Sequence, residues 1–323
     1  MTAQEITNAL INLCEKERSP LLLAGYGGSH AYGTNIPTSD IDIRGIFLNS
    51  SHDLFGIQNA PEQITLPDED AVIYSLKKMM RLLLGCNPNV IEILGLRPED
   101  YLFMTPAGQQ LIDNREIFLS KAVIRTFGAY AYAQLNRLMN KSGRASDNIE
   151  NNEIRSLKKM LMHSRDMDPS AKIDAYEKDN QVMISFQADC PIESFTQMAM
   201  NIINVHSDYR SSTRNNKAIE HGKLSKHMMH LIRLYMTGID ILKDHQIVTY
   251  RTAEHDLLME IRNGKYLNAD KTAPTDEFQE VLDEYSSKFD EAAKHTTLPE
   301  KPNTKAANKL MMDIVSQYYQ IKD

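Results

Sequence analysis

The feature that most constrains this chain is a short apolar run that ends in glycines and is followed closely by two aspartates. LLLAGYG, residues 21–27, is apolar and brief, so it predicts a buried strand that runs into a glycine turn. DIDIRGIFL, residues 40–48, alternates polar and apolar residues and predicts a second strand. TNIPTS, residues 34–39, has the composition of a turn that returns the chain to pair the two strands.

Further patterns extend this start to an α+β protein. The sequence contains both helical and strand patterns. Apolar residues have helical spacing in residues 6–17, a strand-like run at 70–76 passes into a helical stretch at 77–85, and residues 179–187 have a strand pattern. After about residue 113 most of the sequence has helical periodicity. We therefore expect a small α/β domain with a mixed sheet, residues 1–113, and a mostly α-helical domain, residues 114–323.

Bulk composition argues against several classes of protein. A formal net charge of -7 disfavours a protein that coats nucleic acid by electrostatics alone, although local basic grooves are compatible with it. Three widely spaced cysteines indicate neither a disulfide framework nor a cysteine-based zinc site. The charged N-terminal stretch and the lack of a long apolar run predict a cytoplasmic protein with no membrane partner.

Asp40 and Asp42 carry the first chemical signal. Residues two apart in a strand point the same way, so these carboxylates share one face while Ile41 and Ile43 take the other. Two like charges this close repel each other unless a cation lies between them. Hard oxygen ligands suit Mg²⁺ or Mn²⁺, so we expect a divalent metal here.

The glycine turn upstream carries a complementary signal. Gly27, Gly28 and Ser29 leave the first strand where backbone N–H groups are exposed and a short helix is able to begin. Such amides favour a phosphate, and glycine lets the phosphate approach the backbone closely. One half of the stretch therefore suits a phosphate chain, and the other half suits the metal that such a chain carries.

Competing motifs fit less well. A dinucleotide fingerprint needs a glycine where His30 stands, and no Gly-Lys-Ser/Thr follows to complete a Walker A loop. A calcium loop matches at three positions, but Arg44 occupies its fifth position and Ser51 stands where the bidentate glutamate belongs. A D-x-D pair also marks metal-dependent glycosyltransferases, which stay an alternative.

Together these residues resemble a known superfamily. GGSHAYGTNIPTSDIDIRG, residues 27–45, is similar to the G-S-x-A-x-G…S-D-x-D signature of DNA polymerase β-like nucleotidyltransferases, in particular a branch of predicted nucleotidyltransferases from bacteria and phages. The resemblance continues in residues 70–94, 222–242 and 257–267, so it touches both halves of the chain. It supplies no substrate for this branch.

The resemblance implies a role for each matching residue. Gly28 and Ser29 would hold the triphosphate of an NTP, and Asp40 and Asp42 would bind two divalent ions. One ion would lower the pKa of an acceptor hydroxyl, and the other would neutralise the triphosphate and the departing pyrophosphate. Removal of either aspartate should then abolish turnover.

A third carboxylate on a later strand would complete such a site. We choose Asp70, the last acid before the apolar run at 71–75, over the neighbouring Asp68 and Glu69. Arg44, if the strand continues, points with the carboxylates. It would either contact the triphosphate or neutralise the aspartates when no metal is bound.

The helix expected at 223–242 has an apolar stripe and an opposite cationic side. The stripe comprises Leu224, Met228, Leu231, Tyr235 and Leu242, and the cationic side comprises Lys223, Lys226, His227, His230 and Arg233. Lys223, His227 and His230 are candidate contacts to an anionic acceptor or to phosphate. Glu92 is either an outer acid of the site or a residue that packs within the fold.

We therefore expect a metal-dependent nucleotidyltransferase. It would move a nucleoside monophosphate from an NTP to a hydroxyl of RNA, protein or a small molecule and release pyrophosphate. Two alternatives to this reaction are an antitoxin or defence protein of the same fold that modifies a protein partner, and a non-catalytic nucleotide- or RNA-binding module.

Overall fold

The computed structural model describes most of the two ends of the chain and a hairpin between them. The residues described are 1–57, 59–66, 69–128, 130–131, 172–178, 181–187, 189, 191–192, 195–196, 199–200, 202–203 and 224–319. The chain forms two compact units, the first comprising Met1–Ala133, Met229–Asn263 and Glu280–Asp323, and the second Gln134–Met228 and Gly264–Gln279. The domain boundary near residue 113 stays a prediction.

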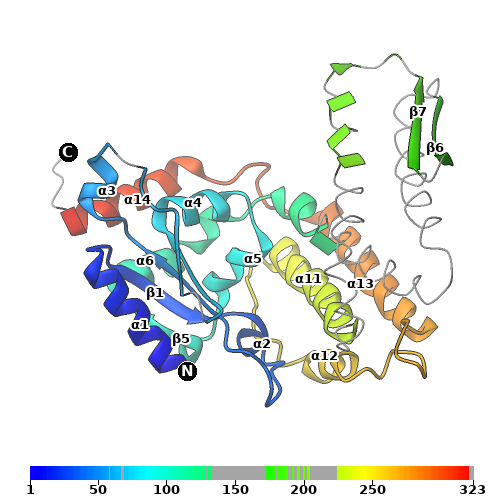
Figure 1. The fold of residues 1–323 in the computed structure, drawn as a ribbon, viewed down its shortest axis with the longest axis horizontal. Coiled ribbons are helices and arrows are strands. Elements are labelled where there is room, and N and C mark those ends of the chain that lie inside the picture. Colours follow the sequence, from blue (N-terminus) through cyan, green and yellow to red (C-terminus); the bar gives the residue numbers. More distant parts are fainter. Residues whose placement is uncertain are drawn as a thin grey trace. The chain divides into compact units, whose positions relative to one another are not determined.

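A five-stranded mixed sheet forms the centre of the first unit (Figure 1). Its strands are β1 (Leu21–Tyr26), β2 (Ile43–Phe47), β3 (Gln63–Leu66), β4 (Ala71–Ser75) and β5 (Tyr101–Met104), in the order β3-β4-β2-β1-β5. β2 and β4 run parallel, and the other neighbouring pairs are antiparallel. The predicted α+β class and the mixed sheet are confirmed.

Helices cover both faces of this sheet. α1 (Ala3–Lys16) packs on one face, while α4 (Leu76–Leu84), α6 (Pro106–Asp113) and α14 (Thr304–Tyr319) lie on the other (Figure 1). α1 begins with a capping box between Thr2 and Glu5. Its buried residues Ile6, Leu10 and Cys14 recur every four positions, so a single stripe of the helix meets the sheet.

The strand that carries the aspartate pair is shorter than the sequence predicts. β2 begins at Ile43, so Asp40 and Asp42 precede it instead of lying within it. The last pair of the β1–β2 ladder is Tyr26 with Ile43, because β1 ends where the glycine turn begins. The backbone of Asp42 still accepts a hydrogen bond from Gly27 N at 2.8 Å, which extends the association by one residue.

Several further helical elements have their bounds within the described residues. They are α2 (Gly28–Tyr32), α3 (Ser51–Phe55), α5 (Pro88–Ile91), η1 (Glu92–Gly95), η2 (Pro98–Asp100), η3 (Arg115–Phe118), α11 (Leu224–Asp244), α12 (His255–Arg262) and α13 (Asp276–His295). In the described part of the chain, no helix combines the length and the apolar character needed to cross a membrane.

The second unit contains a β-hairpin. β6 (Lys172–Lys178) pairs antiparallel with β7 (Gln181–Gln187), in a register that runs from Lys172 opposite Gln187 to Lys178 opposite Gln181. The strand predicted over residues 179–187 is confirmed as β7.

Two buried thiols give a test of this packing. Cys14 is 1% exposed and burial raises its pKa to about 12, while Cys86 is fully buried and burial also raises its pKa. Because the thiolate is the reactive form, both should resist iodoacetamide at about pH 8 in the folded protein and react after unfolding in urea. Peptide-resolved mass spectrometry measures this, and equal labelling with and without urea would contradict the packing.

Candidate active site

The glycine turn after β1 is held against Asp42. Gly28 has φ +54°, a left-handed conformation that glycine adopts without strain. A Cβ atom at Gly28 would overlap Asp42 Oδ2, so the aspartate occupies the space that any other side chain would need. The turn and the aspartate thus lie in direct contact.

Parallel pairing brings a second carboxylate to the same edge of the sheet. Ile43 of β2 lies opposite Ala71 of β4, and Ile43 N donates to the carbonyl oxygen of Asp70 at 2.9 Å. Asp42 and Asp70 are therefore the residues that immediately precede two paired strand starts. Asp70 is more exposed than Asp42, at 53% against 20% of the side chain.

Arg44 connects these two carboxylates. Its Nη2 lies 3.0 Å from Asp70 Oδ1 and 3.6 Å from Asp42 Oδ1, and its Nη1 donates to Asp70 O at 2.9 Å. Both carboxylates therefore face one cationic group.

The structure describes two of the three other acids considered for the site. Asp40 is exposed in the loop before β2, Glu69 lies in the turn before β4, and Asp68 falls outside the described residues. Among the residues that the structure describes, no three His, Cys, Asp or Glu side chains are grouped closely enough to hold a metal ion. Asp42 and Asp70 nonetheless offer hard oxygen donors around one shared cation position, which suits Mg²⁺ or Mn²⁺.

A cavity of about 320 Å³ opens beside the glycine turn. Gly27, Gly28, Asp42 and Arg44 form its charged side. Its remaining wall is mostly aromatic and apolar, with two polar side chains, and comprises Tyr26, Ala31, Tyr32, Tyr74, Met79, Asn89, Val90, Glu92, Ile93 and Leu96. A charged end beside an aromatic and apolar wall suits a ligand that has an anionic part and a flat part.

A larger depression, of about 580 Å³, lies between α3 and α4 and is lined by residues such as Asp53, Glu62 and Arg81. It is lined by none of the predicted site residues. The cavity beside Asp42 is the better candidate because Gly28, Asp42 and Arg44 line it.

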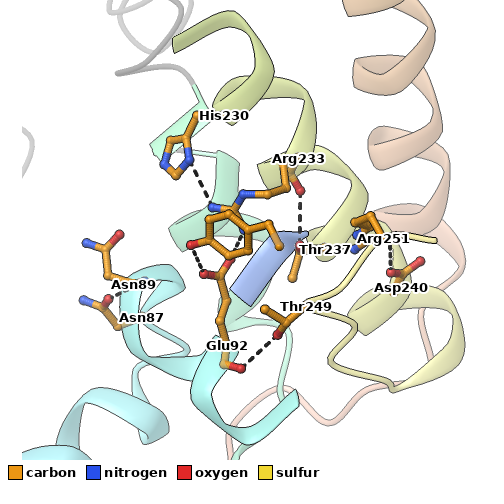
Figure 2. A network of polar contacts seen from close by, with 10 residues as sticks. Asn87, Asn89, Glu92, His230, Arg233, Thr237, Asp240, Thr249 and Arg251 are labelled. Carbon is orange, nitrogen blue, oxygen red and sulfur yellow. Dashed lines mark hydrogen bonds and ion pairs between the residues drawn. The ribbon is translucent and has the colours of Figure 1, made fainter. Parts of the chain in front are cut away.

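Glu92, which lines the cavity, forms a buried ion pair with Arg233 (Figure 2). Arg233 of α11 is 1% exposed and Glu92 is 6% exposed. Tyr32 Oη donates to Glu92 Oε2 at 2.6 Å, and the Arg233 guanidinium stacks 3.5 Å from the centre of the Tyr32 ring. Burial raises the pKa of Tyr32, so its hydroxyl stays protonated and remains a donor.

The sequence analysis missed this network. Arg233 was expected on an open cationic side of its helix, but it is buried because α11 is enclosed on several sides, with Met229, Ile232 and Met236 also buried. The signal was present in HLIRLYM, where one arginine interrupts an apolar run. A charged side chain in such a run is buried without a large energetic cost only when a buried group of opposite charge pairs with it. Glu92 is that group.

The structure describes two of the three candidate acceptor contacts, His227 and His230. Lys223 lies outside the described residues, and His227 is half-buried on α11. His230 Nδ1 lies 3.1 Å from Arg233 Nη2. Because a guanidinium only donates, Nδ1 accepts this hydrogen bond and His230 carries its proton on Nε2.

A second set of contacts joins the C-terminal helices to the loop that follows α2. His255 Nε2 lies 3.0 Å from the carbonyl oxygen of Gly33, to which it donates. Arg262 Nη2 donates to Ser39 Oγ at 3.1 Å, and a Cβ at Gly33 would overlap the Tyr250 ring. The loop between the glycine turn and the aspartates is therefore held by side chains from segments that are not part of the sheet.

Comparison with known proteins bears on this site. The model of the RlaP family, described as an RNA repair pathway DNA polymerase beta family, matches residues 2–313. The chain belongs to this family. Membership agrees with the polymerase β-like resemblance of the glycine turn and aspartate pair, and it points to a nucleotidyltransferase.

A curated relative matches a shorter segment. The uncharacterized 38.9 kDa protein in the nrdC-mobD intergenic region of Enterobacteria phage T4 is 30% identical over 88 residues, covering 24% of this chain and 26% of that protein. The chain thus spans about a quarter of the length of this relative. No solved structure matches the chain.

The buried pair gives a testable energetic prediction. Arg233→Met leaves the Glu92 carboxylate buried without its cation, so we expect a loss of about 3–5 kcal/mol in the free energy of unfolding. Glu92→Leu combined with Arg233→Met should recover most of this loss, since neither charge then remains. Urea unfolding followed by circular dichroism measures both. A loss below about 1 kcal/mol for the single variant is typical of an exposed pair and would contradict the assignment.

Proposed function

We propose that this chain transfers a nucleoside monophosphate from an NTP to a hydroxyl group. The observation that carries the proposal is the contact between Gly28 and Asp42 at the edge of a cavity, with Asp70 joined to Asp42 through Arg44. This arrangement supports a position for phosphate beside carboxylates that suit a divalent cation. Membership of a DNA polymerase beta family supports the same reaction.

In this proposal the protein binds and orients the NTP. Gly28 and Ser29 hold the triphosphate through the backbone N–H groups that follow β1. The acceptor hydroxyl loses its proton to water, its oxygen forms a bond to the α-phosphorus, the bond from that phosphorus to the bridging oxygen breaks, and pyrophosphate leaves. Arg44 provides a planar donor that is able to exchange carboxylate for phosphate oxygens.

Asp40, Asp42 and Asp70 would hold Mg²⁺ or Mn²⁺. Such ions, when bound, lower the pKa of the acceptor hydroxyl and neutralise charge on the triphosphate and the leaving group. The carboxylates would fix the position of such an ion. They also balance the charge of Arg44 when no nucleotide is present.

RNA is the acceptor that we propose, because the family is described as an RNA repair pathway DNA polymerase beta family. A protein partner, as in an antitoxin or defence system, and a small molecule are the other acceptors to be tested. The experiment incubates the full chain with each α-labelled NTP, Mg²⁺ or Mn²⁺, and either RNA or cell lysate. Label in RNA supports the proposal, label in protein or metabolites redirects it, and nucleotide binding without any transfer favours a binding module.

Substitution of the aspartates tests the catalytic assignment. Asp42→Asn and Asp40→Asn each remove a metal-binding charge, so transfer should fall by at least about 100-fold. Asp70→Asn should do the same if Asp70 is the third carboxylate. Asp290→Asn, on the exposed side of α13, is the matched control and should leave the rate unchanged. Wild-type transfer by Asp42→Asn would overturn the proposal.

Gly28→Ala tests the contact with Asp42. The new methyl group would displace the carboxylate and strain the backbone, so transfer should fall by about 100-fold. Gly85→Ala is the control, because its Cβ would lie 3.4 Å from Leu82 O, an ordinary contact. Equal activity of the two variants would show that the glycine turn does not take part.

A further inference from the structure

α2 is a very short helix that follows the glycine turn. α2 spans only Gly28–Tyr32, and its hydrogen bonds include Ala31 N to Gly27 O at 3.4 Å and Gly33 N to His30 O at 3.3 Å. One turn of helix has too few internal bonds to be stable by itself. What holds its last residue, Tyr32, therefore bears directly on where Gly28 lies.

Tyr32 is held by two partners that also hold each other. Its hydroxyl donates to one oxygen of Glu92 at 2.6 Å, and its ring is covered by the Arg233 guanidinium. Arg233 Nη1 pairs with the other oxygen of Glu92. The three side chains form a closed set in which each contacts the other two.

Threonine side chains also form hydrogen bonds with the backbone of Glu92 and Arg233. Thr249 Oγ1 donates to Glu92 O at 2.9 Å, and Thr237 Oγ1 donates to the carbonyl oxygen of Arg233 at 3.1 Å (Figure 2). Tyr32 and Glu92 also line the cavity beside Asp42. A displacement of Arg233 would therefore change the cavity wall and the end of α2 together.

We propose that Arg233 is a positioning residue of the nucleotide site, which through Glu92 and Tyr32 sets the orientation of α2 and hence the contact between Gly28 and Asp42. This inference rests on the proposed nucleotidyl transfer for its kinetic consequence. Its structural consequence, the order of α2, is independent of that reaction.

The chain provides a matched control for a buried arginine. Arg251 is 3% exposed, pairs with Asp240 of α11 at 2.6 Å and donates to Thr237, but none of these contacts reaches α2 (Figure 2). Arg233→Met and Arg251→Met each remove a buried guanidinium and leave a carboxylate behind. A purely stabilising role predicts similar behaviour for both variants.

The experiment measures amide hydrogen exchange over residues 28–34 together with KM and kcat for the NTP. We expect Arg233→Met to speed exchange in this segment, raise KM and lower kcat/KM by about 10-fold or more, while Arg251→Met keeps wild-type exchange there and wild-type KM. Similar exchange and KM in the two variants would overturn the proposal.

Tyr32→Phe gives a milder version of the same test, in case Arg233→Met does not fold. It removes only the hydroxyl that donates to Glu92, and we expect faster exchange in residues 28–34 and a raised KM. Tyr319→Phe, which removes a hydroxyl that donates to Asn49 O, is its control. Wild-type exchange in Tyr32→Phe would refute the link from Glu92 to α2.

If the wild-type chain transfers no nucleotide, the proposed function fails, while the exchange data still decide whether Arg233 orders α2.

Discussion

Parallel pairing between β2 and β4 is the constraint on which the candidate site depends. Asp42 and Asp70 belong to different connections of the chain, and each immediately precedes its strand. Because the strands run in the same direction with Ile43 opposite Ala71, both acids emerge at one edge of the sheet. Antiparallel pairing at this position would have put the two carboxylates at opposite ends.

A second requirement is that this edge be held against the glycine turn. β1 lies next to β2 in antiparallel pairing, so the end of β1 meets the start of β2, and Gly28 comes into contact with Asp42. Three adjacent strands thus converge on one small region. The charges gathered there are balanced by Arg44, which lies between Asp42 and Asp70.

The C-terminal helices contribute to the same region through buried polar contacts. Arg233 reaches Glu92 and Tyr32, which line the cavity, and His255 meets the backbone of Gly33. A buried ion pair tolerates little displacement, because separation of its charges leaves each without compensation. The segment around Arg233 is therefore part of the unit that contains the sheet, although it lies far along the chain.

The sequence by itself determined the local elements, and it predicted the chemistry of the opening motif. Alternation and helical spacing predicted β1, β4, β7 and α1, and the motif predicted that phosphate and metal chemistry belong together, because these signals arise between residues close in sequence. Only the tertiary structure decided that β2 starts at Ile43, that Arg44 joins Asp42 to Asp70, and that Arg233 is buried against Glu92. Each of these features depends on which distant segment of the chain packs against the residue. Helical periodicity alone predicts that a charged residue such as Arg233 faces solvent, unless its buried partner is known.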